Sequence, residues 1–338
     1  MPGVTLKDVA LRAGVSIRTV SNVVNGYEPV SPVRRARVMA AVEELDYRPN
    51  ILARNLRTGR TGLLALVIPE IDVPYFSELA RAMIEEADAR RYRVMIDQTD
   101  GNDARERDHI TGATRALLFD GVIFNPLVMP QDELRDIAGS VPVVLLGEHI
   151  FDGRFDHVAI DNVQAARDAT EHLISIGRKR IAAIGSQPGD AGGTAQLRTS
   201  GYLDALAAHG IRVDRTLMMP TAKFHRADGA AAMAELLARP DPPDAVFCFS
   251  DLLALGAMKA ALDAGLDVPD DLAIVGVDDI EDGRFATPGL STISPDKAMI
   301  AAEAIRRLVE RIEDPTLPVE EIVAGHQLIV RGSSVRRA

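Results

Sequence analysis

The sequence is poor in residues that build covalent and aromatic sites, since its 338 residues include one cysteine and no tryptophan. The single thiol of Cys248 excludes an internal disulfide and a zinc site made of several cysteines, and it is typical of a reducing compartment. We expect Cys248 to be a small buried strand residue. Aromatic residues make up 4% of the chain, so a pocket here cannot depend on tryptophan stacking.

Long apolar runs are also absent. No run reaches the roughly 18 residues that span a bilayer, and the N-terminus has no charged segment followed by an apolar signal core. We therefore expect a cytoplasmic protein with no membrane contact. The length exceeds that of one ordinary domain of roughly 100–200 residues and favours two or three domains.

Charge is distributed unevenly along the chain. Residues 1–60 contain ten lysines or arginines and five acidic residues, which gives +5. The whole chain carries −11 at pH 7, so residues 61–338 carry −16. A small basic head on an acidic body is the asymmetry expected when one segment binds a polyanion such as DNA and the rest does not.

The head has the pattern of three short helices. Thr5 can cap a first helix, Gly14 ends it, and Ser16 can cap a second helix over 17–24. Two short helices joined by a three-residue turn predict a helix-turn-helix. The Ser-Pro pair at 31–32 predicts the start of a third helix, because proline fits the first helical position.

The second helix has the side chains that a recognition helix needs. Arg18 can bond guanine in two places, Asn22 can do the same with adenine, and Ile17 can touch a thymine methyl. Thr19 and Ser21 can hold phosphates, which position the helix without reading sequence. The alternative, an exposed polar face with no role in DNA binding, is disfavoured by the charge division and the turn spacing.

The runs 4–10, 13–16 and 19–25 closely resemble the LacI/GalR family of bacterial repressors. The segment 47–56 extends the resemblance, and in the family it is a hinge helix that pairs with its dimer mate in the minor groove. Leu56 matches the leucine that wedges between base pairs there. The residues expected to contact DNA are Thr5, Ser16, Ile17, Arg18, Thr19, Ser21, Asn22, Asn25, Ala53, Arg54 and Leu56.

The physical reading of the hinge agrees with the resemblance. About seven residues between Pro49 and Gly59 are too few for a stable isolated helix, so this segment is expected to fold when DNA and a partner supply contacts. An exposed leucine near Arg54 and Arg57 suits insertion beside phosphates. The alternative is a plain flexible linker.

The remainder alternates strand-like apolar runs with amphipathic stretches. Expected strands are 63–68, 93–96, 121–124, 141–146, 181–184, 245–249 and 272–277, and expected helices include 77–90, 165–176 and 251–264. The alternation predicts parallel sheets covered by helices on both faces. The number of units favours an α/β body of two doubly wound subdomains, with a ligand cleft at the carboxyl ends of the strands.

The order of these units resembles the family's sensor domain, which is similar to periplasmic sugar-binding proteins. The resemblance implies three parts: a helix-turn-helix domain over 1–49, a hinge helix and linker over 50–60, and an effector-binding domain over 61–338. It also implies crossings between subdomains near residues 161, 291 and 324. The first subdomain is then about 61–160 and 293–323, and the second about 161–290 and 324–338.

The resemblance also indicates which residues hold an effector. Arg198 matches a family arginine that bonds the effector, and Asp278 matches a carboxylate at a strand end. The full set expected at the effector is Tyr75, Phe76, Asn125, Glu148, Ile160, Arg198, Phe224, Ser250, Asp251 and Asp278. Asp251 can instead cap a helix, and the aromatic members can be ordinary core. Glu148 and Ser250 depart from residues common in the family, which leaves the effector's identity open.

Two other classes of protein are less consistent with the sequence. No nucleotide-binding glycine motif, serine-hydrolase motif or histidine metal spacing occurs, so we expect no enzyme, no metal ion and no cofactor. A solute-binding protein without a DNA role explains the body but not the head.

The expected assembly is a homodimer on a palindromic site in double-stranded DNA, because one helix-turn-helix reads half a site. No heptad tail precedes Ala338, so a coiled-coil tetramer is not expected. A sugar inducer is favoured as the effector, with a purine corepressor as the alternative.

Overall fold

The computed structural model describes residues 4–24, 30–47, 60–111, 118–129, 133, 141–147, 153–187 and 193–335. The chain divides into two compact units, Met1–Thr61 and Gly62–Ala338. We call the first unit the head and the second unit the body, and each is described by itself. No helix among the described residues is long and apolar enough to cross a membrane.

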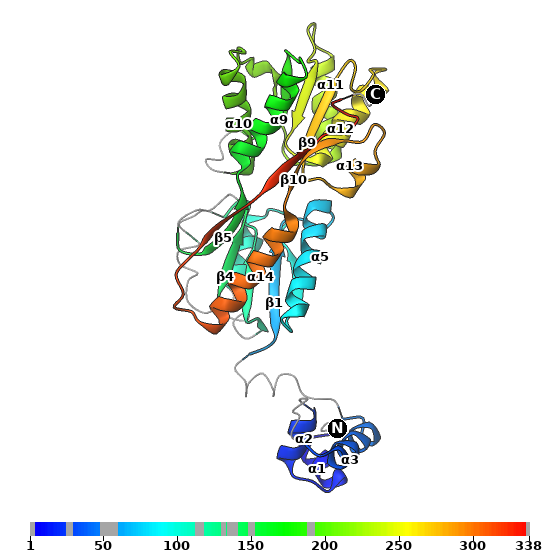
Figure 1. Ribbon diagram of the computed structural model, residues 1–338, viewed down its shortest axis with the longest axis vertical. Coiled ribbons are helices and arrows are strands. Elements are labelled where there is room, and N and C mark those ends of the chain that lie inside the picture. The colour runs from blue at the N-terminus through cyan, green and yellow to red at the C-terminus, as the bar shows by residue number, and fades with distance from the viewer. Residues whose placement is uncertain are drawn as a thin grey trace. The chain divides into compact units, whose positions relative to one another are not determined.

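The head is a cluster of short helices: α1 (Leu6–Ala13), α2 (Ile17–Val24) and α3 (Pro32–Glu44) (Figure 1). The predicted helices are confirmed, including the left-handed Gly14 that ends α1. Small apolar side chains of the three helices, together with Tyr47 just after α3, form the core: Val9, Ala10, Ala13, Val20, Val23, Val38, Ala41 and Tyr47. This core is small, so the helices depend on one another for stability.

One arginine joins the turn of the helix-turn-helix to the third helix. The Arg37 Nη2 donates to the carbonyl oxygen of Ala13 at 2.6 Å, at the end of α1. A Cβ on Gly14 would lie 2.5 Å from the same nitrogen. Glycine is therefore required at this position for its positive φ of 62° and for space around the guanidinium.

The body contains two sheets. The first has the strand order β11-β5-β4-β3-β1-β2, and all its described pairings are parallel. Its strands are β1 (Leu63–Ile68), β2 (Arg93–Gln98), β3 (Gly121–Phe124), β4 (Val143–Leu146), β5 (Asp156–Ile160) and β11 (Glu321–Ala324). Helices α5 (Pro74–Ala89), α6 (Asp103–Thr111) and α14 (Lys297–Glu313) accompany it, and α5 packs beside α14 (Figure 1).

The second sheet has the order β12-β10-β9-β8-β6-β7, with β12 antiparallel to β10 and the other described pairs parallel. Its strands are β6 (Ile181–Ser186), β7 (Met218–Pro220), β8 (Ala245–Cys248), β9 (Ala273–Val277), β10 (Ser291–Pro295) and β12 (His326–Ile329). Its helices are α9 (Asn162–Ser175), α10 (Thr194–Ala208), α11 (Arg226–Leu237), α12 (Asp251–Asp263) and α13 (Glu281–Phe285), with a 3-10 turn, η2, at Arg215–Leu217. We call the parts around these sheets the first and second subdomains.

The helices of the second subdomain pack as two close pairs, α9 with α10 and α11 with α12, on opposite sides of the sheet (Figure 1). Glycine makes the approach possible. A Cβ on Gly201 of α10 would lie 2.0 Å from the backbone oxygen of Val163 in α9. On the other side, a Cβ on Gly256 of α12 would lie 2.0 Å from the backbone oxygen of Arg226.

The chain passes between the sheets three times. The first change follows β5 at 161 and the third lies between β11 and β12 at 325. The second was expected near 291, with the first subdomain resuming at 293. Instead, the chain stays in the second sheet to Pro295, because Ile293 pairs with Val277 and Pro295 pairs with His326. The first subdomain therefore resumes at α14.

Candidate functional site

The outward side of α2 is the candidate DNA-reading face. Val20 and Val23 are buried against α1 and α3, whereas Ile17 is 49% exposed and Arg18 is exposed. Ser16 begins the helix, because its Oγ accepts the Thr19 backbone N–H at 3.1 Å. The hydroxyls of these two residues are 2.9 Å apart. A rigid start to α2 holds its first side chains outward, the direction that major-groove reading requires.

The other residues expected to contact DNA differ in how exposed they are. Ser21 and Asn22 are half-buried on α2. Thr5 is exposed and forms a reciprocal cap with Asp8, whose carboxylate accepts both the Thr5 hydroxyl at 2.7 Å and the Thr5 amide at 2.8 Å. These hydrogen bonds lower the pKa of Asp8. Outside the described residues lie Asn25, Ala53, Arg54, Leu56, the hinge stretch through residue 59, and Glu148 of the expected effector set.

In the body, the expected effector residues follow the ends of parallel strands. Asn125 comes directly after β3 and Ile160 ends β5 in the first sheet. Ser250 follows β8, and Asp278 follows β9, in the second sheet. Carboxyl ends of parallel strands meet at one edge of a sheet, which is where ligands of such folds bind. The topology therefore places these residues at the carboxyl edges of the two sheets.

Arg198 of α10 is the centre of a polar cluster at the edge of the second sheet. It is 7% exposed, and its Nε donates to the Asn162 Oδ1 at 2.7 Å. Its Nη1 donates to the backbone oxygen of Phe249, just past β8. Its positive charge also acts on the carboxylate of Asp278. We call Asn162, Arg198, Phe249 and Asp278 the strand-end cluster.

Asp278 is buried and has an unusual backbone conformation. It is 8% exposed and has a φ of 118°, a conformation that L residues rarely adopt. Burial raises the pKa of its carboxyl group to about 6, although the charges of Arg198 and Lys297 oppose the rise. The carboxylate of the next residue, Asp279, forms ion pairs with Arg284 at 2.8 Å and with Arg331 at 2.7 Å. Backbone strain beside a buried carboxylate is typical of a binding site.

Asp251 was expected at the effector, but its side chain lies inside the protein. It is fully buried, its Oδ1 accepts the Thr292 hydroxyl at 2.6 Å, and its Oδ2 accepts the Ile280 amide at 3.0 Å. Burial, followed by the negative charge of Asp278, raises its pKa well above the ordinary value. Both oxygens are engaged inside the protein, so the structure places Asp251 in the core and not at a ligand surface. Ser250 has the capping role, because its Oγ accepts the Leu253 amide at 3.2 Å.

The expected aromatic wall is partly buried. Tyr75 and Phe76 meet edge to face with ring centroids 5.2 Å apart, and Phe224 packs against the main core. The Lys297 Nζ lies 6.0 Å from the centroid of the Tyr75 ring. Lys297 also donates to the backbone oxygen of Asp278 at 2.7 Å. The Tyr75 ring and the Asp278 strand end are therefore joined through a single lysine.

Two glutamates of the first subdomain bind groups of the second. Glu70, after β1, accepts Lys223 at 2.6 Å and His225 at 2.5 Å. Burial alone would raise the pKa of Glu70, but hydrogen bonds from these two residues lower it. Glu78 of α5 accepts the Glu281 amide of the second subdomain at 3.2 Å, and it also binds Lys297 of α14, in its own subdomain, at 2.5 Å. Sequence reasoning missed these pairs and Asn162, since the partners lie far apart along the chain.

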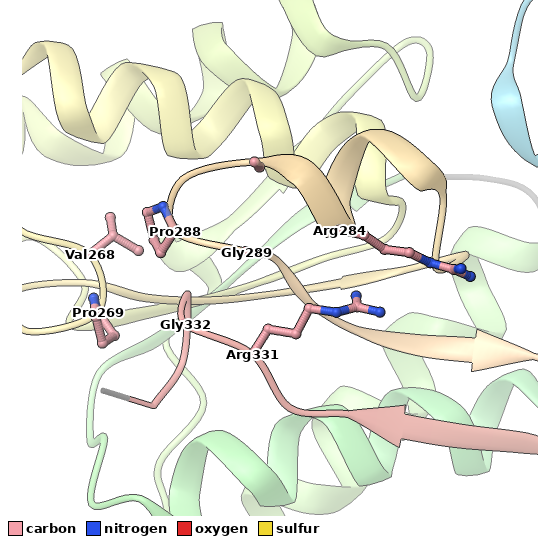
Figure 2. A pocket seen from close by; sticks show the side chains of 8 residues that line it. Val268, Pro269, Arg284, Pro288, Gly289, Arg331 and Gly332 are labelled. Atoms are coloured by element: carbon pink, nitrogen blue, oxygen red, sulfur yellow. The ribbon is translucent and has the colours of Figure 1, made fainter. Parts of the chain in front are cut away.

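A separate depression of about 520 Å³ lies in the second subdomain. Its lining includes Val268, Pro269, Arg284, Pro288, Arg331 and Gly332. The two guanidinium groups extend in one direction, away from the prolines (Figure 2), and both bind Asp279. None of the expected effector residues lines this depression, so it is distinct from the candidate site.

Comparison with known proteins gives the same division of the chain. The family description "Bacterial regulatory proteins, lacI family" matches residues 5–50, and "Periplasmic binding protein-like domain" matches residues 170–334. The ribose operon repressor of Escherichia coli (strain K12) is 35% identical over 332 residues, which cover 98% of this chain and 99% of that protein. The chain belongs to the LacI family.

Solved structures of LacI-family proteins agree with this membership. The transcriptional regulator CelR in complex with cellobiose is 33% identical with a TM-score of 0.73, over 98% of this chain and all of that one. The Lac repressor dimer bound to operator and the anti-inducer ONPF is 26% identical with a TM-score of 0.84, over 98% of this chain and 99% of that one. The predicted family and fold class are confirmed, as is a non-enzymatic, DNA-binding transcriptional regulator.

Proposed function

We propose that this LacI-family regulator is a dimeric repressor that binds a palindromic operator through α2 and is released by a sugar bound at the strand-end cluster. The observation that supports it most is the cluster itself. A buried cation, Arg198, and a buried carboxylate, Asp278, lie together at the carboxyl ends of parallel strands. Such a pair supplies both donors and an acceptor to a ligand with many hydroxyl groups.

A sugar is favoured over other effectors by the chemistry of the surroundings. Tyr75 and Phe224 are half-buried, and we propose them as apolar walls beside polar groups, a combination that suits the faces and hydroxyls of a sugar ring. Two relatives also support a sugar effector, since one is named for the ribose operon and another was solved in complex with cellobiose. Asn125 and Ile160 are proposed to line the opposite side, with Ser250 near the cluster.

The homodimer is supported by an apolar surface of the body. Ile84 of α5 is 38% exposed, Met95 and Ile96 of the edge strand β2 are 52% and 40% exposed, and Phe285 of α13 is 80% exposed. Helix α5 contacts β2, and the Glu281 amide at the start of α13 donates to Glu78 of α5. Exposed apolar side chains on an edge strand are stabilised when a partner covers them.

The proposed response is a change in the separation of the subdomains. An effector that contacts both strand edges stabilises one arrangement, and in a dimer this changes the spacing of the two hinges. We propose that the hinge helix over 50–60 folds on DNA, with Ala53, Arg54 and Leu56 in the minor groove, and that Thr5, Ser16 and Asn25 support α2 in the major groove. A regulator of this kind acts in the cytoplasm, where its operator is.

The effector proposal is tested by a thermal-shift screen of the full chain with D-ribose, cellobiose, glucose and the nucleobases guanine and hypoxanthine. A bound sugar raises the melting temperature by mass action. A rise with a nucleobase alone would replace the sugar by a purine. Arg198→Ala is expected to abolish the shift and leave DNA binding unchanged. Arg212→Ala, an exposed arginine of the same subdomain, is the control.

The DNA proposal is tested separately by selecting bound sequences from a random duplex pool. Enriched sites with two-fold symmetry, and a dimer mass by light scattering, are the expected results. Sites without symmetry, or a monomer at micromolar concentration, would contradict the dimeric reading. Arg18→Ala is expected to relax base preference at one position in each half-site and cost about 1–3 kcal/mol.

A further inference from the structure

Asn162 occupies a special place in the chain. It is the first residue of α9, directly after the chain leaves β5 for the second subdomain. The side chain is 1% exposed, and its Oδ1 accepts the Nε of Arg198 at 2.7 Å. The cap of α9 is supplied by Asp161, whose side chain accepts the Gln164 amide. Asn162 is therefore not needed as the helix cap.

The orientation of the Asn162 amide follows from its partner. An arginine Nε–H can only donate, so the atom that faces it must be the carbonyl oxygen. The Nδ2 group then points elsewhere with two N–H donors. This nitrogen is fully buried and has no acceptor among the described residues. Buried donors in native proteins are nearly always satisfied, so an unpaired one calls for an explanation.

The residues around Asn162 indicate what kind of group its unpaired Nδ2 binds. Asn162 shares Arg198 with Phe249 and Asp278, at the edge where parallel strands of such folds bind ligands. Because the Arg198 Nε lies 2.7 Å from the Asn162 Oδ1, a molecule that binds Arg198 also lies next to the Asn162 side chain. The missing group is an acceptor, because Nδ2 can only donate. Among the groups of a sugar, hydroxyl and ring oxygens meet this need.

We propose that Asn162 determines specificity at the effector site: its carbonyl oxygen positions the Arg198 guanidinium, and its amide nitrogen donates a hydrogen bond to an oxygen of the sugar. This inference rests on the proposed function. A site that offers a buried donor rejects a ligand lacking the matching acceptor, because the donor is then left unpaired. Asn162 thus selects for a hydroxyl or ring oxygen at one position of the effector.

Two variants separate the roles of the two amide atoms. Asn162→Asp keeps an oxygen facing Arg198 and removes both N–H donors, whereas Asn162→Ala removes donor and acceptor together. D-ribose and cellobiose are the probes, titrated into the full chain by calorimetry. If Asn162 donates to the sugar, both variants lose at least tenfold in affinity. If Asn162 only positions Arg198, Asn162→Asp binds as wild type, and the proposal is overturned.

The ligand-free protein gives a second, independent measurement. Asn162→Asp replaces the unpaired donor by a carboxylate oxygen beside Arg198. It is expected to raise the melting temperature by about 2 °C or more at pH 5, where burial keeps the nearby Asp278, with its pKa of about 6, mostly protonated. Asn162→Ala, which leaves Arg198 without this partner, lowers it. A fall with Asn162→Asp at this pH would contradict an unpaired Nδ2 and would overturn the proposal. If neither sugar shifts wild type, the sugar-effector function fails, and this measurement still decides whether Nδ2 is unpaired.

Discussion

Asp278→Asn is the substitution for which the structure gives the clearest magnitude. Burial raises the pKa of Asp278 from 3.8 to about 6. The folded state therefore holds this proton more tightly than the unfolded chain does, and the free energy of unfolding falls as the pH rises through this interval. A pKa change of this size corresponds to about 3 kcal/mol of destabilisation well above pH 6. Asparagine does not ionise, so the variant escapes this loss.

The assay is the melting temperature of wild type and Asp278→Asn from pH 5 to 7.5. Roughly half of the loss falls within this range, so the variant gains a few degrees relative to wild type as the pH rises. Asp282→Asn, with a side chain 49% exposed, is the control and should follow wild type. Parallel profiles for wild type and Asp278→Asn would refute the reasoning. The variant should also lose its response to sugar, since the carboxylate acceptor is gone.

Three further substitutions test the packing that supports the site. Gly201→Ala forces a Cβ to within 2.0 Å of the α9 backbone and should destabilise the body by about 1–3 kcal/mol, measured by urea unfolding beside the exposed control Gly325→Ala, where a Cβ meets nothing within 4 Å. Asp156→Asn removes the buried carboxylate that binds Arg307 at 2.7 Å and also binds Arg311, so that Arg307 keeps Glu310 and Glu320 as carboxylate partners; it should cost about 3–5 kcal/mol at pH 7, whereas a cost under 1 kcal/mol would contradict a buried pair. Arg37→Ala removes a hydrogen bond from α3 to the end of α1, where Arg12 and Glu44 form a further link, and should destabilise the head by about 1 kcal/mol. Operator binding should weaken as a result, with effector binding unchanged.

Much of the fold followed from local pattern. The apolar runs at 63–68 and 121–124 gave strands with the predicted bounds, because buried parallel strands are continuous apolar segments. Strands β5, β7, β10, β11 and β12 were missed. The sequence of β5 carries Asp156 and His157, and β11 and β12 lie at sheet edges with half-exposed side chains. Their strand character comes from pairing with distant segments, which local composition does not encode.

The site was predicted less completely than the fold. Arg198 and Asp278 were identified through the family motif, and the structure brings both to one cluster. Asp251 shares the same strand-end position in the sequence, yet its side chain turns inward to Thr292 and Ile280. An aspartate just after a strand can therefore face a binding site or the core. The direction of its side chain depends on where the hydrogen-bond donors near it lie, and the sequence pattern does not show this.

The sequence by itself determined the basic helix-turn-helix, the α/β alternation and the family, since these depend on residue types at short, fixed spacings. The tertiary structure alone decided that Asn162 meets Arg198 across 36 residues and that Glu70 meets Lys223 across 153. It also decided that Asp278 is buried enough for its pKa to rise. Contacts and burial of this kind depend on how separate segments pack, and no local pattern in the chain specifies them.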